Sequence, residues 1–285
     1  MIQMDAPAKV NLGLDVVRRR PDGYHEVDMI MQTIGLHDTV TMEPAKEPGI
    51  RLTTDHPELP VDDGNLAYRA AKLIMRAAHS ENQGVSIHIE KRIPVAAGLA
   101  GGSTDAAAVL LGLNELFSFG FSGEHLEELG LSLGADIPYC IRRGTARARG
   151  IGEKLTDLPS VPRIPCLIAK PEESVSTKAV YQGLSLSERT IHPDIDALEQ
   201  AVRSGELERI APLMGNLLET VTIPMHPVID RIKALMIKGG AAVSLMSGSG
   251  PTVFGLFRDE NTRDQAEEIV RKENVAKQIC STYLE

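Results

Sequence analysis

Apolar and polar residues alternate along the first part of the chain. From residue 10 to residue 16, apolar side chains stand at every second position, with polar residues or glycine between them. Such a period of two predicts a half-buried strand. Similar short segments at residues 27–31, 39–42, 50–53 and 85–89 predict further strands. The chain is therefore expected to open as a mostly antiparallel sheet.

Three segments in the same part of the chain change to the period of a helix. Residues 65–79 place apolar side chains on one helical face and follow a capping sequence at residues 63–65. Residues 106–116 consist mainly of alanine and leucine, which predicts a helix in the core. Residues 124–133 predict a third helix, which ends at Gly134.

Strands and helices are mixed without regular alternation in the rest of the chain. Strands are predicted at residues 164–169, 242–246, 252–257 and 279–283, and helices at residues 176–181, 195–202, 207–222, 227–237 and 262–272. This order is typical of an α+β protein. Because the pattern restarts after Gly150, we expect two domains, residues 1–155 and residues 156–285.

Composition narrows the class of protein. Of 285 residues, 42% are hydrophobic and 24% are charged, which excludes a disordered or fibrous protein. The formal charge of −9 and the 4% of aromatic residues argue against a nucleic-acid binder. No apolar stretch resembles a membrane helix, and the three cysteines form no C-x-x-C pair. We therefore expect a cytoplasmic protein with reduced thiols, and with neither a nucleic acid nor a membrane as partner.

A glycine-rich loop links a predicted strand to the predicted core helix. Gly98, Gly101 and Gly102 allow backbone N–H groups to approach a ligand closely, and a helix N-terminus attracts phosphate. Ser103 or Thr104 can add a hydroxyl. The loop is not a G-x-x-x-x-G-K-[ST] motif, because no lysine follows Gly102, and the chain holds no G-x-G-x-x-G. A flexible surface turn with Ser103 as an ordinary N-cap is the alternative interpretation.

A second loop of small residues lies between two predicted strands near the C-terminus. Residues 247–252 read S-G-S-G-P-T, which is more glycine than a hairpin turn requires. A permissive hairpin is the alternative here. Together, the two loops predict two walls of one nucleotide site.

Three motifs resemble those of the GHMP kinases. Residues 94–107 (P-V-A-A-G-L-A-G-G-S-T-D-A-A) resemble the phosphate loop of this family, and residues 6–12 and 247–252 resemble its other two motifs, in the same order. Ala100 and Thr104 replace a glycine and a serine that many members carry. The resemblance implies an α+β kinase with a ribosomal-protein-like N-terminal domain and a ferredoxin-like C-terminal domain.

Further motifs resemble one branch of that family. Residues 21–25 (P-D-G-Y-H), 133–138 (L-G-A-D-I-P) and 175–181 (V-S-T-K-A-V-Y) resemble the branch that phosphorylates the 2-hydroxyl of a cytidine diphosphate ester of methylerythritol. This reaction belongs to the non-mevalonate route to isoprenoids. The resemblance thus implies a small-molecule substrate with a cytidine diphosphate group, and we expect a monomer or a weak homodimer.

The resemblance also implies roles for particular residues. Lys9 and Asp136 match the catalytic pair. The residues that match the ATP site are Asn65, Pro94, Val95, Ala96, Ala97, Gly98, Leu99, Ala100, Gly101, Gly102, Ser103 and Thr104. The residues that match the acceptor site are Asn11, Tyr24, His25, Thr177, Tyr181, Gly248 and Ser249, with the cytosine base between aromatic rings and read by His25. Mg²⁺ is expected with ATP and held mainly by its phosphates, so no metal ligand is assigned to the chain.

Elementary chemistry gives each catalytic role a rationale and an alternative. Phosphoryl transfer needs positioning and charge stabilisation, which Lys9 can supply, while Asp136 accepts the proton of the attacking hydroxyl or only orients it. Taken alone, Asp136 is typical of a helix cap, Lys9 of a solvated strand face and His25 of a turn. A GHMP kinase with another acceptor, such as homoserine or mevalonate, would leave the tyrosines and His25 unexplained. A nucleotide sensor without turnover would not need Lys9 and Asp136.

Overall fold

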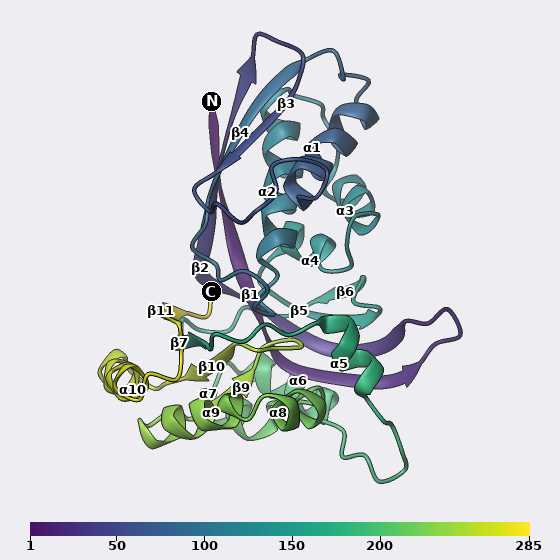
Figure 1. The fold of residues 1–285 in the computed structure, drawn as a ribbon. Coiled ribbons are helices and arrows are strands. Elements are labelled where there is room, and N and C mark those ends of the chain that lie inside the picture. The colour runs from purple at the N-terminus through teal and green to yellow at the C-terminus, as the bar shows by residue number, and fades with distance from the viewer. The chain divides into compact units, whose positions relative to one another are not determined.

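Two long strands, β1 (Ile2–Arg19) and β2 (His25–Ala45), pair with each other and contribute residues to both units of the structure. The computed structural model describes residues 1–285 (Figure 1). Unit 1 comprises Met1–Ala8, Leu36–Val95 and Ala100–Arg143, and unit 2 comprises Lys9–Gly35, Ala96–Leu99 and Gly144–Glu285. The units interleave along the sequence, and the expected boundary after residue 155 stays a prediction.

Unit 1 consists of a sheet with helices on one face. Its other strands are β3 (Gly49–Thr54) and β4 (Gly84–Glu90), and its helices are α1 (Leu66–Ala77), α2 (Gly101–Leu116), α3 (Gly123–Leu131) and α4 (Ile137–Arg142). Strand β4 pairs antiparallel with β2 and parallel with β3. Helices α1, α2 and α3 lie on one side of these strands (Figure 1). The alanine and leucine side chains of α2 are mostly buried, so the predicted core helix is confirmed.

Helix α1 begins where the sequence predicts. The side chain of Asn65 accepts a hydrogen bond of 2.9 Å from the amide of Ala67, which satisfies one of the unpaired donors of the first turn. Its own amide group donates to the carbonyl of Pro60 at 2.8 Å. The apolar face, from Ala67 to Met75, packs into the core of unit 1.

Unit 2 contains a second sheet in addition to its part of β1 and β2. The remaining strands are β5 (Thr145–Gly150), β6 (Lys154–Asp157), β7 (Pro165–Lys170), β8 (Gly215–Asn216), β9 (Val243–Met246), β10 (Val253–Leu256) and β11 (Gln278–Tyr283). The helices are α5 (Thr177–Gly183), α6 (Ile195–Ser204), α7 (Leu207–Ile210), η1 (Ala211–Leu213), α8 (Glu219–Met225), α9 (Val228–Lys238) and α10 (Glu260–Lys272). The second sheet has the order β11-β7-β10-β9 and is antiparallel throughout.

The second sheet has the connectivity of a ferredoxin-like fold. Strand β7 leads through helices to the β9–β10 hairpin, and α10 returns the chain to β11 beside β7. Helix α9 packs on β9 and β10, and α10 packs on β7 and β11. The predicted ferredoxin-like C-terminal part is therefore confirmed.

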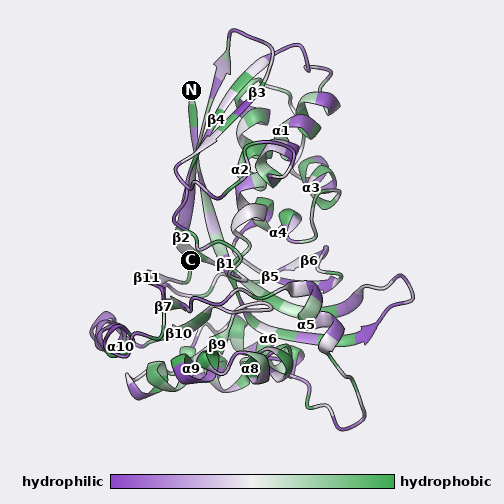
Figure 2. Cartoon of the chain, viewed as in Figure 1, coloured by the Kyte–Doolittle hydropathy of each residue, from purple (hydrophilic) through white to green (hydrophobic).

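Hydropathy follows burial in this sheet. Strands β9 and β10 are hydrophobic, whereas α10 is largely hydrophilic (Figure 2). Such an amphipathic arrangement is expected when a helix covers one face of a sheet and meets solvent on its other side. No helix of the structure combines the length and the apolar character that a membrane span requires.

Most predicted elements are confirmed, with three kinds of difference. Residues 39–42 are not a separate strand but part of the long strand β2. The single helix predicted over residues 207–222 is wrong, because Pro212 and Gly215 interrupt it and Gly215 and Asn216 pair with β1 instead. Strands β5 and β6 and helix α4 were not predicted, since β5 alternates alanine with arginine and α4 has only 6 residues.

Residues 8–16 of strand β1 are buried on both faces, which corrects the prediction of a half-buried strand. Its apolar positions, such as Leu12, face the core as expected. Its polar positions Lys9, Asn11 and Asp15 are buried as well. A strand with a buried polar face is unusual in an antiparallel sheet and marks this face as a candidate site.

Candidate active site

Lys9, in unit 2, is a buried lysine. Its side chain is 5% exposed, and its Nζ donates a hydrogen bond of 2.8 Å to Oδ1 of Asn11. The amide group of Asn11 in turn donates to Sδ of Met29 at 3.3 Å. Burying an ammonium group is costly unless polar groups surround it. Lys9 is therefore not a solvated charge on a strand face.

The two glycine-rich loops meet beside Lys9. The hydroxyl of Ser247 donates to the carbonyl of Gly98 at 3.0 Å, and the amide of Lys9 donates to the carbonyl of Leu99 at 3.2 Å. A Cβ atom on Gly98 would lie 2.3 Å from the carbonyl oxygen of Ser247. A Cβ atom on Gly248 would lie 3.6 Å from Nζ of Lys9. The structure thus brings together Lys9, Gly98 and Gly248, which are distant in the sequence.

The side chains of Asn216 and Glu219 hold the second glycine-rich loop, residues 247–252, in place. The amide group of Asn216 donates to the carbonyls of Met246 and Gly248, at 2.8 Å each. Oε1 of Glu219 accepts from the amide of Met246 at 2.7 Å. The loop is buried, so it is not a permissive surface hairpin. The sequence pattern does not indicate this role of Asn216 and Glu219, since both lie in the segment that it predicts to be one helix, residues 207–222.

The start of α2 in unit 1 is open toward a ligand. The first hydrogen bond of the helix runs from the amide of Thr104 to the carbonyl of Ala100, at 2.9 Å. The amides of Gly101, Gly102 and Ser103 precede that bond and are not satisfied within the helix. A Cβ atom on Gly102 would meet only the side chain of Leu66, at 3.6 Å. These residues fit an anionic group such as a phosphate.

Hydroxyl groups at the start of α2 differ in their surroundings. Thr104 is buried, and its hydroxyl donates to the carbonyl of Pro7 at 2.8 Å. Ser103 is half-buried. The alternative in which Ser103 caps the helix does not hold, because the N-cap position is Ala100, which has no capping side chain.

Alternate residues of the phosphate-loop motif have positive φ. The values are 51° at Ala96, 74° at Gly98 and 59° at Ala100. Left-handed residues of this kind are a feature of the backbone nests that bind anions. Alanine is uncommon in this region of φ, and such residues cluster at ligand sites. The backbone conformation therefore supports the phosphate-loop interpretation.

Asp136 stands at the N-cap position of α4 in unit 1. Its carboxylate makes no capping hydrogen bond with the helix, so the cap alternative does not account for it. Lys9 belongs to unit 2, and the assignment of the two residues as a catalytic pair stays a prediction. Asn65 is placed at the start of α1, and its contact with adenine stays a prediction as well.

Two of the aromatic residues predicted for the acceptor site lie together. The rings of His25 and Tyr181 are 5.2 Å apart between centroids, with an interplanar angle of 38°. Tyr24 is 62% exposed in the turn before β2. Burial, and then the charge of Arg19, lower the pKa of His25 below its usual value of 6.5. His25 is therefore neutral at pH 7, with one ring nitrogen that donates and one that accepts.

Thr177 and Ser249 also lie together. Their hydroxyl oxygens are 2.8 Å apart and share a hydrogen bond. Thr177 is exposed at the start of α5, next to its N-cap Ser176, and Ser249 belongs to the second glycine-rich loop. This contact connects the segment that carries Tyr181 to the loop that lies beside Lys9.

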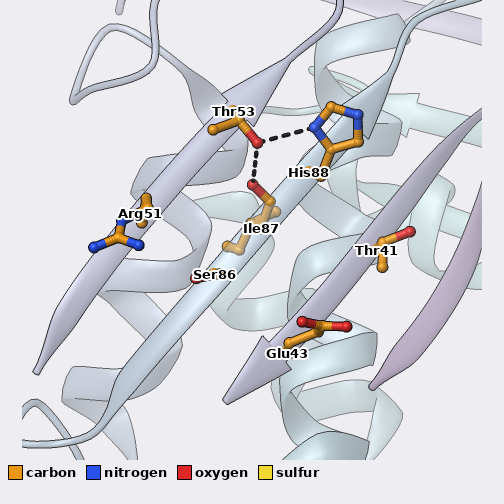
Figure 3. Close-up of a pocket in the computed structure, with 7 residues that line it drawn as sticks. All are labelled: Thr41, Glu43, Arg51, Thr53, Ser86, Ile87 and His88. Atoms are coloured by element: carbon orange, nitrogen blue, oxygen red, sulfur yellow. Dashed lines mark hydrogen bonds between the residues drawn. The ribbon is translucent and has the colours of Figure 1, made fainter. Parts of the chain in front are cut away.

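A separate hollow of about 100 Å³ lies on the outer face of the sheet in unit 1 (Figure 3). It is lined by residues of β2, β3 and β4: Thr41, Glu43, Arg51, Thr53, Ser86, Ile87 and His88. Within it, the hydroxyl of Thr53 lies 2.9 Å from Nδ1 of His88. None of the residues predicted for the active site lines this hollow, and its polar side chains are those of a solvated sheet face.

The chain is similar to known kinases along almost its whole length. The family described as GHMP kinases N terminal domain matches residues 65–144, and the family described as GHMP kinases C terminal matches residues 197–276. A 4-diphosphocytidyl-2-C-methyl-D-erythritol kinase of Lachnospira eligens is 48% identical over 281 residues, covering 99% of this chain and 97% of that protein. A kinase of the same name from Lachnoclostridium phytofermentans is 51% identical over 266 residues, covering 93% and 91%.

Solved structures show the same fold. A crystal structure of 4-(cytidine 5'-diphospho)-2C-methyl-D-erythritol kinase matches with a TM-score of 0.84 and 35% identity, over 99% of both chains. A homoserine kinase from Cytophaga hutchinsonii matches with a TM-score of 0.80 and 21% identity, over 100% of this chain and 94% of the other. The second likeness concerns the fold alone.

Gly98→Ala is expected to lower the free energy of unfolding by about 3 kcal/mol, because it combines a strained φ with a backbone overlap. Gly102→Ala is the matched control, since its Cβ meets only a flexible leucine side chain, and its free energy of unfolding should stay within about 0.5 kcal/mol of the wild type. Urea unfolding measures both. Equal midpoints for the two variants would contradict the close approach of the loops.

Proposed function

Since the chain belongs to the GHMP kinase family, we propose that it transfers the γ-phosphoryl group of ATP to the 2-hydroxyl of 4-diphosphocytidyl-2-C-methyl-D-erythritol, giving the 2-phosphate and ADP. The observation that carries this proposal is the near-full-length similarity to kinases of that name. The reaction serves the formation of isoprenoid precursors by the non-mevalonate route.

ATP binds through its phosphates at the glycine-rich segment. The amides of Gly101, Gly102 and Ser103 at the start of α2 donate to phosphate oxygens, and the positive end of the helix favours their charge. Mg²⁺, when bound with ATP, neutralises charge on the phosphates and is held mainly by their oxygens. In unit 2, Gly98 and Gly248 keep side chains away from the space next to Lys9.

Lys9 and Asp136 carry the chemistry in this proposal. The 2-hydroxyl oxygen of the acceptor attacks the γ-phosphorus, the bond to the β–γ bridging oxygen breaks, and ADP leaves. The hydroxyl proton passes to the carboxylate of Asp136, which either takes it during the attack or first orients the hydroxyl. Lys9, desolvated and hydrogen-bonded to Asn11, stabilises the charge that develops on the transferred group.

The cytosine of the acceptor binds at His25 and Tyr181. The centroids of these rings are 5.2 Å apart, so a base stacks on the outer face of a ring rather than between the two. Tyr24 is exposed and free to cover the other face of the base. A neutral imidazole offers a donor and an acceptor, which suits the polar edge of cytosine.

The proposal is tested by measuring ADP release from Mg·ATP with a panel of acceptors. The panel contains 4-diphosphocytidyl-2-C-methyl-D-erythritol, free methylerythritol, homoserine and mevalonate. We expect turnover only with the cytidylated acceptor. Turnover with homoserine or mevalonate would retain the kinase and reject the cytosine site. ATP binding without turnover on any acceptor would support a nucleotide sensor instead.

Asp136→Asn is expected to lower kcat by about 10²- to 10⁴-fold, because the amide cannot accept the hydroxyl proton. ATP binding should stay within about twofold, since the start of α2 is untouched. Asp194→Asn is the matched control, because Asp194 is an N-cap whose carboxylate accepts from the amide of Ala197, a role that asparagine also fills. A kcat for Asp136→Asn near that of the control would remove Asp136 from the mechanism.

His25→Ala is expected to raise KM for the acceptor by about 10- to 100-fold while KM for ATP stays unchanged, because one base loses its stacking and hydrogen-bonding partner. His88→Ala, on the outer face of unit 1, is the control. Since burial and Arg19 lower the pKa of His25, the wild-type acceptor KM should rise as the solution becomes more acidic and the ring gains a proton. An equal rise of both KM values would reject the cytosine assignment.

A further inference from the structure

A buried lysine in unit 1 lies between two carboxylates that the mechanism does not use. Lys91 follows β4, and its side chain is 4% exposed. Its Nζ donates to Oδ2 of Asp105 at 2.7 Å and contacts Oδ2 of Asp38. Asp38 lies on β2 and Asp105 on α2, so one side chain connects the sheet to the helix. Because a buried ion pair often adds little net stability, the position of Lys91 between two carboxylates requires another explanation.

Asp38 fixes the chain segment that leads into the phosphate-loop motif. Its Oδ1 accepts from the amides of Arg92 and Ile93, at 2.6 and 2.8 Å. The amide of Lys91 itself donates to Oδ1 of Asp55 at 2.9 Å. Residues 91–93 are therefore held by side chains from two other segments just before the motif begins at residue 94.

Lys91 also lies close to the first residue of α2, Gly101. A Cβ atom on Gly101 would be 3.5 Å from Nζ of Lys91 and 3.1 Å from the side chain of Ile93. Asp105 follows Gly101 by about one helical turn. On another side, the hydroxyl of Thr104 donates to the carbonyl of Pro7. The first turn of α2 is thus held at Thr104 and at Asp105.

The cluster formed by Lys91, Asp38 and Asp105 has a net charge that depends on the protonation of Asp105. Burial raises the pKa of Asp105 to about 7, Lys91 opposes this rise, and Asp38 adds to it. Burial alone would lower the pKa of Lys91, but the two carboxylates raise it overall, so Lys91 stays charged. Oδ1 of Asp105 is buried and has no hydrogen-bond partner. The cluster is neutral when Asp105 is protonated and carries one negative charge when it is not.

We propose that Lys91 is a positioning residue for ATP: by bridging Asp38 and Asp105 it fixes the first turn of α2, where the phosphates bind, and neutralises carboxylate charge behind that turn. This inference rests on the proposed function, because it assumes that ATP phosphates bind at Gly101–Ser103. In this proposal Lys91 acts through the backbone of the helix, because its ammonium group is paired with Asp38 and Asp105.

Direct binding of Mg·ATP to the full chain tests the proposal without an acceptor. By calorimetry, Lys91→Met should weaken ATP binding by about 10- to 100-fold, because a displaced first turn misaligns the amides. Arg51→Met is the control, since Arg51 is an exposed cation of the same unit with only a 3.8 Å pair to Glu47. In turnover assays, KM for ATP should rise and KM for the acceptor should not. Unchanged ATP binding, or an equal rise in both KM values, would overturn the proposal.

Asp105→Asn gives a second test that does not depend on the stability of Lys91→Met. Asparagine keeps an acceptor for Lys91 but cannot ionise, so residue 105 adds no charge to the cluster between pH 6 and pH 8. Between pH 6 and pH 8, the affinity of the wild type for ATP should fall about threefold relative to that of the variant, because only the wild type gains a negative charge behind the phosphates. The titration of ATP itself cancels in this ratio. A ratio that does not change with pH would contradict the proposed charge neutralisation.

The two proposals fail in different ways. If the wild type binds ATP but phosphorylates none of the acceptors, the proposed function fails, and the effects of Lys91→Met and Asp105→Asn on ATP binding still decide the role of Lys91. If the wild type phosphorylates the cytidylated acceptor but both variants bind ATP like the wild type, only the role of Lys91 fails.

Discussion

The close approach of two backbone segments determines the arrangement around Lys9. The carbonyl oxygen of Gly98 accepts a hydrogen bond from the hydroxyl of Ser247, and no side chain larger than hydrogen fits at residue 98. The adjacent carbonyl of Leu99 accepts a hydrogen bond from the amide of Lys9, so the position of the lysine depends on the contact between Gly98 and Ser247. Asn216 holds the other loop at Gly248. Protein interiors transmit displacements of this kind because they are closely packed. Loosening one loop would therefore move the ammonium group as well.

The buried cations of the structure are held by polar or charged partners. Lys9 is buried and donates a hydrogen bond to the neutral amide of Asn11. Lys91 is paired with two carboxylates, Asp38 and Asp105, and connects β2 to α2. Arg147 is also compensated, by Asp28 and Glu199 among others, and joins β5 to β2 and α6. Lys91 and Arg147 are thus cations that hold elements of the fold together.

Local patterns in the sequence predicted most elements and the two glycine-rich loops, because both depend on neighbouring residues. The sequence predicts that the two loops form two walls of one nucleotide site, but it does not predict the direct backbone contact of Gly98 with residues 247–250. The support from Asn216 was missed, because a side chain that donates to two carbonyls 30 and 32 residues away leaves no periodic signal. Strand β5 was missed for a related reason: Arg147 is buried by ion pairs rather than by apolar character.

The shared fold does not select the acceptor. A homoserine kinase shares this fold, with a TM-score of 0.80 at 21% identity, so the fold alone does not determine the acceptor. Selection must then come from side chains outside that common frame. His25 begins strand β2 and Tyr181 lies on α5, and neither belongs to the two glycine-rich loops. Because burial keeps His25 neutral, its ring edge can recognise an uncharged base rather than a second anion. In the proposed function, the contact of His25 with Tyr181 therefore distinguishes the acceptor, whereas the backbone of the glycine-rich loops binds the phosphates.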